Sequence, residues 1–401
     1  MRIIHTADWH LGQFFYSKSR AREHQAFLDW LLDQIVQHQV DALIIAGDLF
    51  DTGSPPSYAR EMFNRFVVAL QPSGCQLVVL AGNHDSVATL NESRELLACL
   101  NTQVITSATP QGEQQVLTLK QRDGAPGALL CAIPYLRPRD ILRSQAGQSG
   151  REKQISLLEA IEQHYQHCFA AAQSMNSALP IIATGHLTTV GVTKSDSVRD
   201  IYIGTLDAFP AQAFPPADYI ALGHIHRAQR IANSEHIRYS GSPIPLSFDE
   251  LGRDKSVFLL EFGDKLKEVT PLTIPHFQPM QMLKGSMAEI EHQLAQFSES
   301  TSEQPTWLDI EITTQEYLSD LQRRIEALTE NLPVEVLLVR RSREQRQRSL
   351  ERLENETLSE LKVEEVFARR LAQEDQLDAE QAEQLTQLFR TQLAALENPS
   401  A

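Results

Sequence analysis

The sequence predicts an α/β fold in which strands alternate with helices, and three observations support this prediction. Six short apolar runs are rich in Ile, Val and Leu, as buried strands are. Amphipathic stretches with apolar residues at helical spacing separate the first three runs. Five of the six runs lead directly into short segments that contain Asp, Asn or His. Because ligands of open α/β sheets bind beyond the carboxyl ends of the strands, we expect a polar site there.

Most of the predicted elements lie in the first 262 residues. The apolar runs are residues 3–4, 42–46, 77–81, 129–133, 181–184 and 219–222. Helices are predicted over 23–37 and 58–70, where apolar residues recur every three or four positions. Further along, shorter runs alternate with turns, including 236–239 and 257–262, and predict a second, more antiparallel sheet that closes the core.

The remainder of the chain predicts a second domain. Three prolines between residues 271 and 279 interrupt the pattern and predict the end of a catalytic domain of residues 1–270. Residues 280–340 predict a small separate α/β module. Its strand, helix and strand are expected over 307–313, 315–330 and 333–339.

The C-terminal segment is expected to be helical. Six arginines between residues 340 and 352 indicate a solvated linker over 341–356. Two amphipathic helices are expected over 357–401. The second carries an apolar stripe of Leu385, Leu388, Phe389, Leu393 and Leu396. This stripe either packs on its own domain or covers a partner protein, and periodicity alone leaves both possibilities open.

Composition and charge narrow the class of protein. Hydrophobic residues make up 42% of the chain, and no apolar run approaches the roughly 20 residues that a membrane-spanning helix needs. The first residues lack the pattern of a signal peptide, so we expect a cytoplasmic protein without membrane contact. The cysteines Cys75, Cys99, Cys131 and Cys168 are widely spaced and predict buried core residues rather than disulfides. A net charge of −16 argues against non-specific nucleic-acid binding by the whole surface.

Five short motifs offer metal-binding side chains. They are Asp8-Trp9-His10, Gly47-Asp48, Gly82-Asn83-His84-Asp85, Gly185-His186 and Gly223-His224-Ile225-His226. Two divalent cations that clamp a phosphate need a bridging carboxylate, neutral imidazoles and further oxygen ligands. The motifs supply this set without a thiolate, which suits Mn²⁺, Fe or Zn²⁺ rather than Ca²⁺. Alone, each motif is weak, since a polar pair in an ordinary loop is the commoner meaning.

In this order the motifs resemble the signature of the calcineurin-like metallophosphoesterases over residues 1–262. The resemblance implies a two-layer β-sandwich flanked by helices. It implies that Asp8, His10 and His226 bind one metal, that Asn83, His186 and His224 bind the other, and that Asp48 bridges them. His84 would protonate the leaving oxygen instead of binding metal. A supporting role for His84 near the site is the alternative.

Longer phrases around the motifs resemble the double-strand-break-repair nucleases of the SbcD type. These phrases are residues 5–12, 46–51, 80–86, 219–226 and 239–245. The resemblance implies cleavage of DNA by a Mn²⁺-activated water, as a 3′→5′ exonuclease on duplex ends and an endonuclease on single strands and hairpins. It implies work with an SbcC-type coiled-coil ATPase in DNA repair and recombination, in a heterotetramer of two nuclease and two ATPase subunits.

The resemblance also implies roles for other parts of the chain. The module at 280–340 would grip DNA, and the helices at 357–401 would dock on the ATPase coiled coil. Helices near 58–70 and 91–100 would form a nuclease homodimer. Archaeal and eukaryotic relatives commonly carry a second catalytic His three residues after the bridging Asp, where this chain has Asp51. We assign Asp51 no proton transfer; it either orients the site or caps a loop.

Positive side chains near the predicted site are candidates for binding DNA. They are Arg20, Arg60, Lys194 and Arg199, each with a solvated surface charge as the alternative. The segment 188–199 is predicted to form a mobile loop over the site. Two rival functions are a phosphoesterase for a small phosphodiester or phosphoprotein and a catalytically silent DNA-binding scaffold. The extra module and tail disfavour the first, and the complete ligand set disfavours the second.

Overall fold

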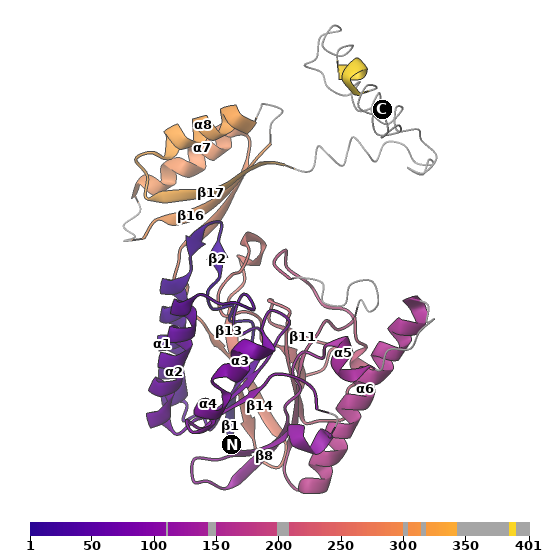
Figure 1. The fold of residues 1–401 in the computed structure, drawn as a ribbon. Helices are drawn as coiled ribbons and strands as arrows, with labels where there is room; N and C mark the ends of the chain where they lie inside the picture. The colour runs from indigo at the N-terminus through magenta and orange to yellow at the C-terminus, as the bar shows by residue number, and fades with distance from the viewer. Residues whose placement is uncertain are drawn as a thin grey trace. The chain divides into compact units, whose positions relative to one another are not determined.

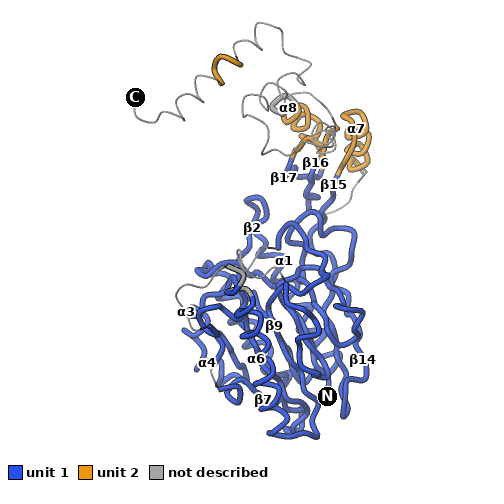
Figure 2. Tube along the Cα trace, turned by 90° about the vertical axis from the view of Figure 1, so that its right-hand side faces the viewer, with its two compact units in different colours: residues 1–282, 300–309, 333–338 blue, residues 283–299, 310–332, 339–401 orange. Residues whose placement is uncertain are grey.

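The computed structural model describes residues 1–109, 111–142, 150–198, 208–299, 304–313, 318–342 and 385–389. The chain forms two compact units, shown in Figure 2. Unit 1 contains residues 1–282, 300–309 and 333–338, and unit 2 contains 283–299, 310–332 and 339–401. Every helix in the described part of the chain is too short or too polar to cross a lipid bilayer.

Two six-stranded sheets form the centre of unit 1. The first has the order β14-β13-β1-β4-β5-β6, with β1 at Arg2–Thr6, β4 at Ala42–Ala46, β5 at Gln76–Leu80, β6 at Thr102–Ile105, β13 at Ser256–Phe262 and β14 at Leu266–Thr273. The second has the order β11-β12-β10-β9-β8-β7, with β7 at Val116–Lys120, β8 at Pro126–Cys131, β9 at Ile181–His186, β10 at Tyr219–Gly223, β11 at Gln229–Arg230 and β12 at Ile237–Tyr239. In the first sheet β1, β4, β5 and β6 are parallel, and β13 and β14 are antiparallel to their neighbours at one side. In the second sheet β12, β10, β9 and β8 are parallel, and the edge strands β11 and β7 are antiparallel to their neighbours.

The strands alternate between two cores because successive side chains leave a strand on opposite faces. Ala42 and Ile44 of β4 pack between the two sheets with Tyr219 of β10. Leu43 and Ile45 of β4 face the other way, toward helices on the outside of the first sheet. Both faces of each sheet are therefore covered at its centre, which explains why central strands such as β4 and β10 are apolar throughout.

Helices cover the outer face of each sheet (Figure 1). On the first sheet they are α1 (Ala21–Gln37), α2 (Ser57–Leu70), α3 (Val87–Glu92) and α4 (Arg94–Ala98), and on the second the long helix α6 (Gly150–Met175), with the short α5 (Pro138–Ile141) beside it. This arrangement confirms the predicted two-layer sandwich flanked by helices.

Two features of the sheets differ from prediction. The strands after His226 do not make a sheet of their own, because β12 joins β10 and β13 joins β1. Pro271 does not interrupt the pattern as expected, because it pairs with Phe258 inside β14. A proline is tolerated there because β14 is an edge strand, whose outer side needs no backbone donor.

A three-stranded sheet follows in the order β15-β16-β17, with strands at Met280–Gly285, Thr306–Ile312 and Val334–Arg341. Helix α8 (Leu318–Thr329) lies within the predicted range, whereas α7 (Met287–Ala295) was not predicted, although its capping box of Ser286 and Glu289 is visible in the sequence. Of the predicted linker and terminal helices, only residues 341–342 and 385–389 are described, and the rest lies outside the described residues. Residues 385–389 are helical.

All four cysteines are free. Cys75, Cys131 and Cys168 are buried as expected, but Cys99 is exposed at the end of α4.

Candidate metal centre

The five motifs meet at one edge of the sandwich. Each directly follows or ends a parallel strand: β1, β4 and β5 in the first sheet, and β9 and β10 in the second. Parallel strands that point the same way end at the same edge, so their following loops converge there. Main-chain hydrogen bonds tie the loops together, from Asp8 N to Gly47 O at 3.0 Å and from His10 N to Asp48 O at 3.1 Å.

One cluster contains Asp8, His10 and His226. Each offers one atom to a group whose atoms lie within 4.8 Å of one another, and all three side chains are buried. The carboxylate of Asp8 accepts a hydrogen bond from the main-chain N of His224 at 2.8 Å through Oδ1. The His10 and His226 rings meet edge to face, with centroids 5.1 Å apart. This is the set that the family resemblance implies for the first metal.

A second cluster contains Asp48, His186 and His224, with the amide of Asn83 beside it. Nε2 of His186 lies 3.2 Å from Oδ2 of Asp48 and 2.9 Å from Oδ1 of Asn83. The same Oδ2 of Asp48 is 3.7 Å from Nε2 of His10, a member of the first cluster. The Asp48 carboxylate therefore lies between the two clusters, as a bridging ligand must.

Three buried atoms of the centre have no hydrogen-bond partner among the described residues: Asp8 Oδ2, His10 Nε2 and His224 Nε2. A buried polar atom without a partner is costly, so a group of three in one place needs an explanation. Lone pairs of carboxylate and imidazole are metal ligands, and the mixed N/O set without thiolate suits Mn²⁺, Fe or Zn²⁺. The residues present thus fit divalent cations.

The ligand loops have a strained backbone. Asp8, His10, Asp48 and His224 have φ values of 55°, 47°, 50° and 91°, in the left-handed region that residues with a side chain disfavour. Such strain gathers at functional sites because the surrounding structure has to impose it. Tight packing of the sheet ends imposes it here.

Glycines in the motifs make this packing possible. A Cβ atom on Gly47 would lie 2.1 Å from Nδ1 of His186, and one on Gly223 would lie 1.9 Å from the main-chain O of Ala46. On Gly82 it would lie 2.1 Å from Oδ1 of Asp48. Each of these glycines therefore gives room to a residue of another motif or strand.

Burial and mutual charge set the protonation of the centre. Burial alone would raise the pKa of Asp48, but the adjacent His186, His10 and His84 hold it well below its usual range. Burial would lower the pKa of His186, yet the charge of Asp48 and their hydrogen bond raise it to about 9. Burial raises the pKa of Asp8. Metal ligands must be deprotonated, so cation binding here would release protons.

His84 and Asp51 lie next to the clusters. Nδ1 of His84 is 2.6 Å from the main-chain O of Asp51, and the His84 main-chain N donates to Oδ1 of Asp48 at 2.9 Å. The carboxylate of Asp51, whose role the sequence left open, lies 3.1 Å from Nδ1 of His10. Atoms of His10, Asp48 and His84 also lie within 4.8 Å of one another, so distance alone does not separate His84 from the ligands.

Supporting residues were missed by sequence reasoning. Asp85 stands in the third motif but was given no role; its carboxylate accepts hydrogen bonds from the main-chain N of Leu49, Phe50 and Gly82, which ties two ligand loops together. Glu250 and Lys255 form a buried ion pair behind His226. In the sequence, neither of them is distinguishable from an ordinary surface charge.

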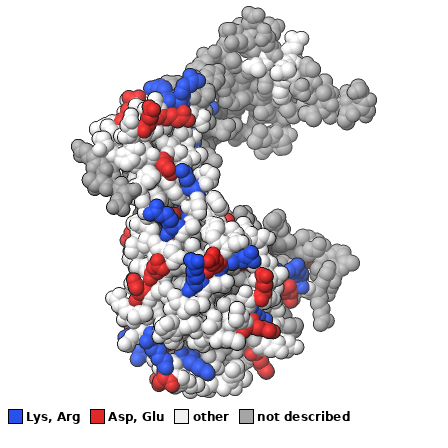
Figure 3. Space-filling model, turned by 60° about the vertical axis from the view of Figure 1, so that its left-hand side comes forward, with Lys and Arg blue, Asp and Glu red and all other residues white. Residues whose placement is uncertain are grey.

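The structure places the basic side chains that were candidates for binding DNA in different environments. The prediction is wrong for Arg20, which is fully buried, pairs with Glu23 and lies over the ring of Phe15 at 4.9 Å. Arg60 is half-exposed on α2, 3.7 Å from Glu92, and Lys194 is exposed in the loop after β9. Arg199 lies outside the described residues. Figure 3 shows Lys and Arg interspersed with Asp and Glu on the visible face, without one extended basic patch among the described residues.

Known proteins resemble this chain over most of its length. A model of the calcineurin-like phosphoesterase family matches residues 1–228, and a model described as the type 5 capsule protein repressor C-terminal domain matches residues 276–375. The chain is 65% identical over 401 residues to the D subunit of the SbcCD nuclease of Escherichia coli (strain K12), covering 99% of this chain and 98% of that protein. Proteins of the same name from Rhodobacter capsulatus and Bacillus subtilis (strain 168) are 36% and 31% identical, over 71% and 80% of this chain and 71% and 81% of theirs.

Proposed function

Because this chain belongs to the calcineurin-like phosphoesterase family, and within it to the SbcD nucleases, it is a metal-dependent nuclease, and we propose that two divalent cations serve its cleavage of DNA. Asp8, His10 and His226 would hold one cation, Asn83, His186 and His224 would hold the other, and Asp48 would contribute to both. The observation that carries this proposal is the position of the Asp48 carboxylate, 3.2 Å from His186 and 3.7 Å from His10. We propose Mn²⁺ as the ion, in keeping with the N/O ligand set.

The residues of this chain divide the work of hydrolysis. Two bound cations would polarise the phosphate and activate a water for in-line attack on phosphorus. His84 protonates the leaving oxygen. Its Nδ1–H donates to the carbonyl of Asp51, which can only accept, so Nε2 is the nitrogen that exchanges a proton with the substrate. Asp51 orients His10 through its carboxylate and His84 through its carbonyl.

The proposed substrates are DNA ends and DNA structures. In this proposal the protein is a 3′→5′ exonuclease on duplex ends and an endonuclease on single strands and hairpins, in DNA repair and recombination in the cytoplasm. Lys194, exposed in the loop after β9, is a candidate phosphate contact. A blunt duplex and a DNA hairpin, incubated with the purified chain, its ATPase partner and Mn²⁺, test the proposal. We expect cleavage of both; intact DNA together with rapid hydrolysis of a small phosphodiester would show the rival function instead.

Partners are part of the proposal. An SbcC-type coiled-coil ATPase would bind the terminal helices at 357–401, in a heterotetramer of two nuclease and two ATPase subunits, and the module at 280–340 would grip DNA. A nuclease homodimer would form through α2 and the α3–α4 segment. A groove of about 730 Å³ between these helices supports the dimer, as do Val68 and Leu96, apolar side chains that are 60% and 67% exposed.

A further inference from the structure

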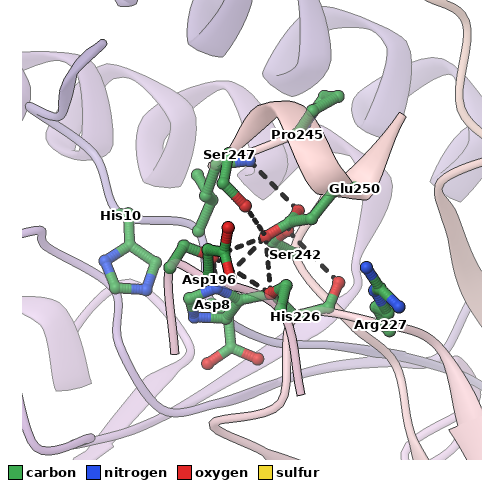
Figure 4. A network of polar contacts seen from close by, with 12 residues as sticks. Asp8, His10, Asp196, His226, Arg227, Ser242, Pro245, Ser247 and Glu250 are labelled. Atoms are coloured by element: carbon green, nitrogen blue, oxygen red, sulfur yellow. Dashed lines mark hydrogen bonds and ion pairs between the residues drawn. The ribbon is translucent and has the colours of Figure 1, made fainter. Parts of the chain in front are cut away.

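A buried polar network lies behind the first cluster (Figure 4). At its centre is Glu250, which is 3% exposed. Its Oε1 accepts hydrogen bonds from Oγ of Ser195 at 2.9 Å and from Oγ of Ser197 at 2.5 Å. Its Oε2 accepts from Nζ of Lys255 at 2.5 Å and from the main-chain N of Leu246 at 3.1 Å. The carboxylate thus joins the loop after β9 to the loop after β12.

Ser197 connects this network to His226. Its Oγ lies 2.6 Å from Nδ1 of His226 as well as 2.5 Å from Glu250. A carboxylate only accepts, so the single hydroxyl hydrogen of Ser197 goes to Glu250. Nδ1 of His226 must then carry its own hydrogen and donate it to Ser197. This tautomer leaves the lone pair on Nε2, the form in which an imidazole binds a metal.

Lys255 stabilises the buried carboxylate and holds His226 a second time. Its ammonium group lies 2.9 Å from the main-chain O of His226 and 2.8 Å from Oγ of Ser242, besides its contact with Glu250. An unpaired buried carboxylate would be strongly unfavourable, and the ion pair offsets this cost. The pair therefore holds His226 at both its ring and its backbone.

We propose that Glu250 is a positioning residue which, through Ser197 and with Lys255 as its counter-charge, fixes the tautomer and orientation of His226 for metal binding. This inference rests on the proposed ligand set, in which His226 holds the first cation. Groups that hydrogen-bond the second nitrogen of a metal-binding histidine fix its ring and raise its basicity. Because the Ser197 hydroxyl lies between Glu250 and His226, the loop after β9 helps to orient a candidate ligand that follows β10.

The loop offers a matched pair of variants. Ser195 and Ser197 both donate to the same oxygen of Glu250, but only Ser197 also contacts His226. Ser195→Ala therefore removes a hydrogen bond to Glu250 and leaves the contact between Ser197 and His226 intact. Ser197→Ala removes that contact and leaves only the direct separation of 3.5 Å between Nδ1 of His226 and Oε1 of Glu250. Ser197→Thr restores a hydroxyl at the same position.

The test measures cation binding to the full-length chain by Mn²⁺ titration calorimetry, with His226→Ala as the reference. We expect Ser197→Ala and Glu250→Gln to lower the affinity for one of the two cations by about 10- to 100-fold. Ser195→Ala and Ser197→Thr should stay within about threefold of the original chain. Melting temperatures in chelator show whether each variant is folded; if Glu250→Gln unfolds, the two serine variants carry the comparison, because they remove only one hydroxyl from a loop.

The outcomes separate this inference from the proposed function. If His226→Ala loses one cation while Ser197→Ala and Glu250→Gln bind both as tightly as the original chain, the positioning role is wrong and the ligand set stands. Equal weakening by Ser195→Ala and Ser197→Ala would also overturn it, since the effect would then not run through His226. If His226→Ala itself binds both cations normally, the ligand set is wrong and the inference falls with it.

Discussion

The imidazole of His84 is bound to the main chain of Asp51: its Nδ1 lies 2.6 Å from the Asp51 carbonyl oxygen. A carbonyl cannot donate, so the hydrogen on Nδ1 is fixed and the other nitrogen handles any proton exchange. The same Asp51 contacts His10 through its carboxylate. Asp51, three residues after Asp48, thus contacts both His10, a candidate ligand, and His84, the candidate acid.

Replacing His84 with Ala should stop cleavage but keep the cations. General acid catalysis contributes about 10²- to 10⁴-fold, so we expect a fall of that size in the rate on a DNA hairpin. Metal content after dialysis and DNA binding should match the original chain. His167→Ala, at an exposed position on α6, is the control. Loss of one cation from His84→Ala would identify His84 as a ligand.

Gly47→Ala should damage the metal centre more than the same change at a matched glycine. Gly47 and Gly252 both have left-handed φ angles, 96° and 84°, but an added Cβ meets His186 only at Gly47 and has nothing within 4 Å at Gly252. Gly252→Ala should cost about 1–2 kcal/mol for its backbone alone. Gly47→Ala should cost roughly 1–3 kcal/mol more through the clash, and should weaken Mn²⁺ binding. Urea unfolding and calorimetry measure the two effects, and equal losses at both positions would contradict the role of packing.

Divalent cations should stabilise the folded protein through the buried lone pairs of the centre. At a free Mn²⁺ concentration of about 100 times Kd, one bound ion adds about 2.7 kcal/mol to the free energy of unfolding. Thermal unfolding in chelator and in rising Mn²⁺ measures the gain. Asp48→Asn should abolish most of it, while Glu235→Gln, at an exposed side chain that pairs with Arg230 and Arg238, should not. A melting temperature that does not change with the Mn²⁺ concentration would refute cation binding by these residues.

Acid should destabilise the fold through His5. This histidine is buried between the sheets, with Nδ1 3.0 Å from the Tyr219 hydroxyl, and burial lowers its pKa from 6.5 to about 3. Between these two values the unfolded chain binds a proton that the folded chain does not. His5 therefore leaves the free energy of unfolding undiminished above pH 6.5. As the pH falls from 6.5 toward 3, its burial in the neutral form lowers the free energy of unfolding by about 1.4 kcal/mol per pH unit.

The free energy of unfolding of the chelator-treated protein, measured in urea from neutral pH down into this window, checks the effect. In His5→Gln, the slope of the free energy of unfolding against pH should correspond to one proton fewer taken up on unfolding, whatever the absolute stability of the variant. An identical slope in the variant would mean that His5 does not contribute.

Deleting residues 357–401 should abolish copurification with the ATPase partner and leave the metal content unchanged. The apolar stripe of that segment is expected to bury its leucines in the partner, and its loss removes the contact. A chain that lacks only residues 398–401, beyond the stripe, is the control. Retained copurification of the longer deletion would rule out the docking proposal.

Local pattern predicted which residues come together at the candidate metal centre, because the motifs carry their polar side chains in two to four adjacent residues. Asp8 and His10, or His224 and His226, are brought to the site by the strand they follow, so sequence order and strand ends suffice. Glu250 and Lys255 could not be found in this way, because a buried charge is recognised only by what surrounds it. Arg20 illustrates the converse: a cation near a motif was expected in solvent, and packing against Phe15 placed it inside.

The central part of the fold was predicted from the sequence, and its edges were not. Runs of apolar residues indicated the central strands, but edge strands such as β14 alternate weakly and even contain Pro271, and α6 does not follow the strand pattern. The pairing of β13 with β1, which joins strands more than 250 residues apart in the chain, follows from the assembly of the sandwich rather than from any local signal.

The division of the motifs between the two sheets has a consequence for the cell. Each proposed cation would take ligands from both sheets: Asp8 and His226 for one, Asn83 and His186 for the other. Neither half of the sandwich can build a complete coordination shell by itself. A chain still emerging from the ribosome, or one trapped with a single sheet formed, would therefore lack both cation sites, and cleavage would begin only once both halves have come together.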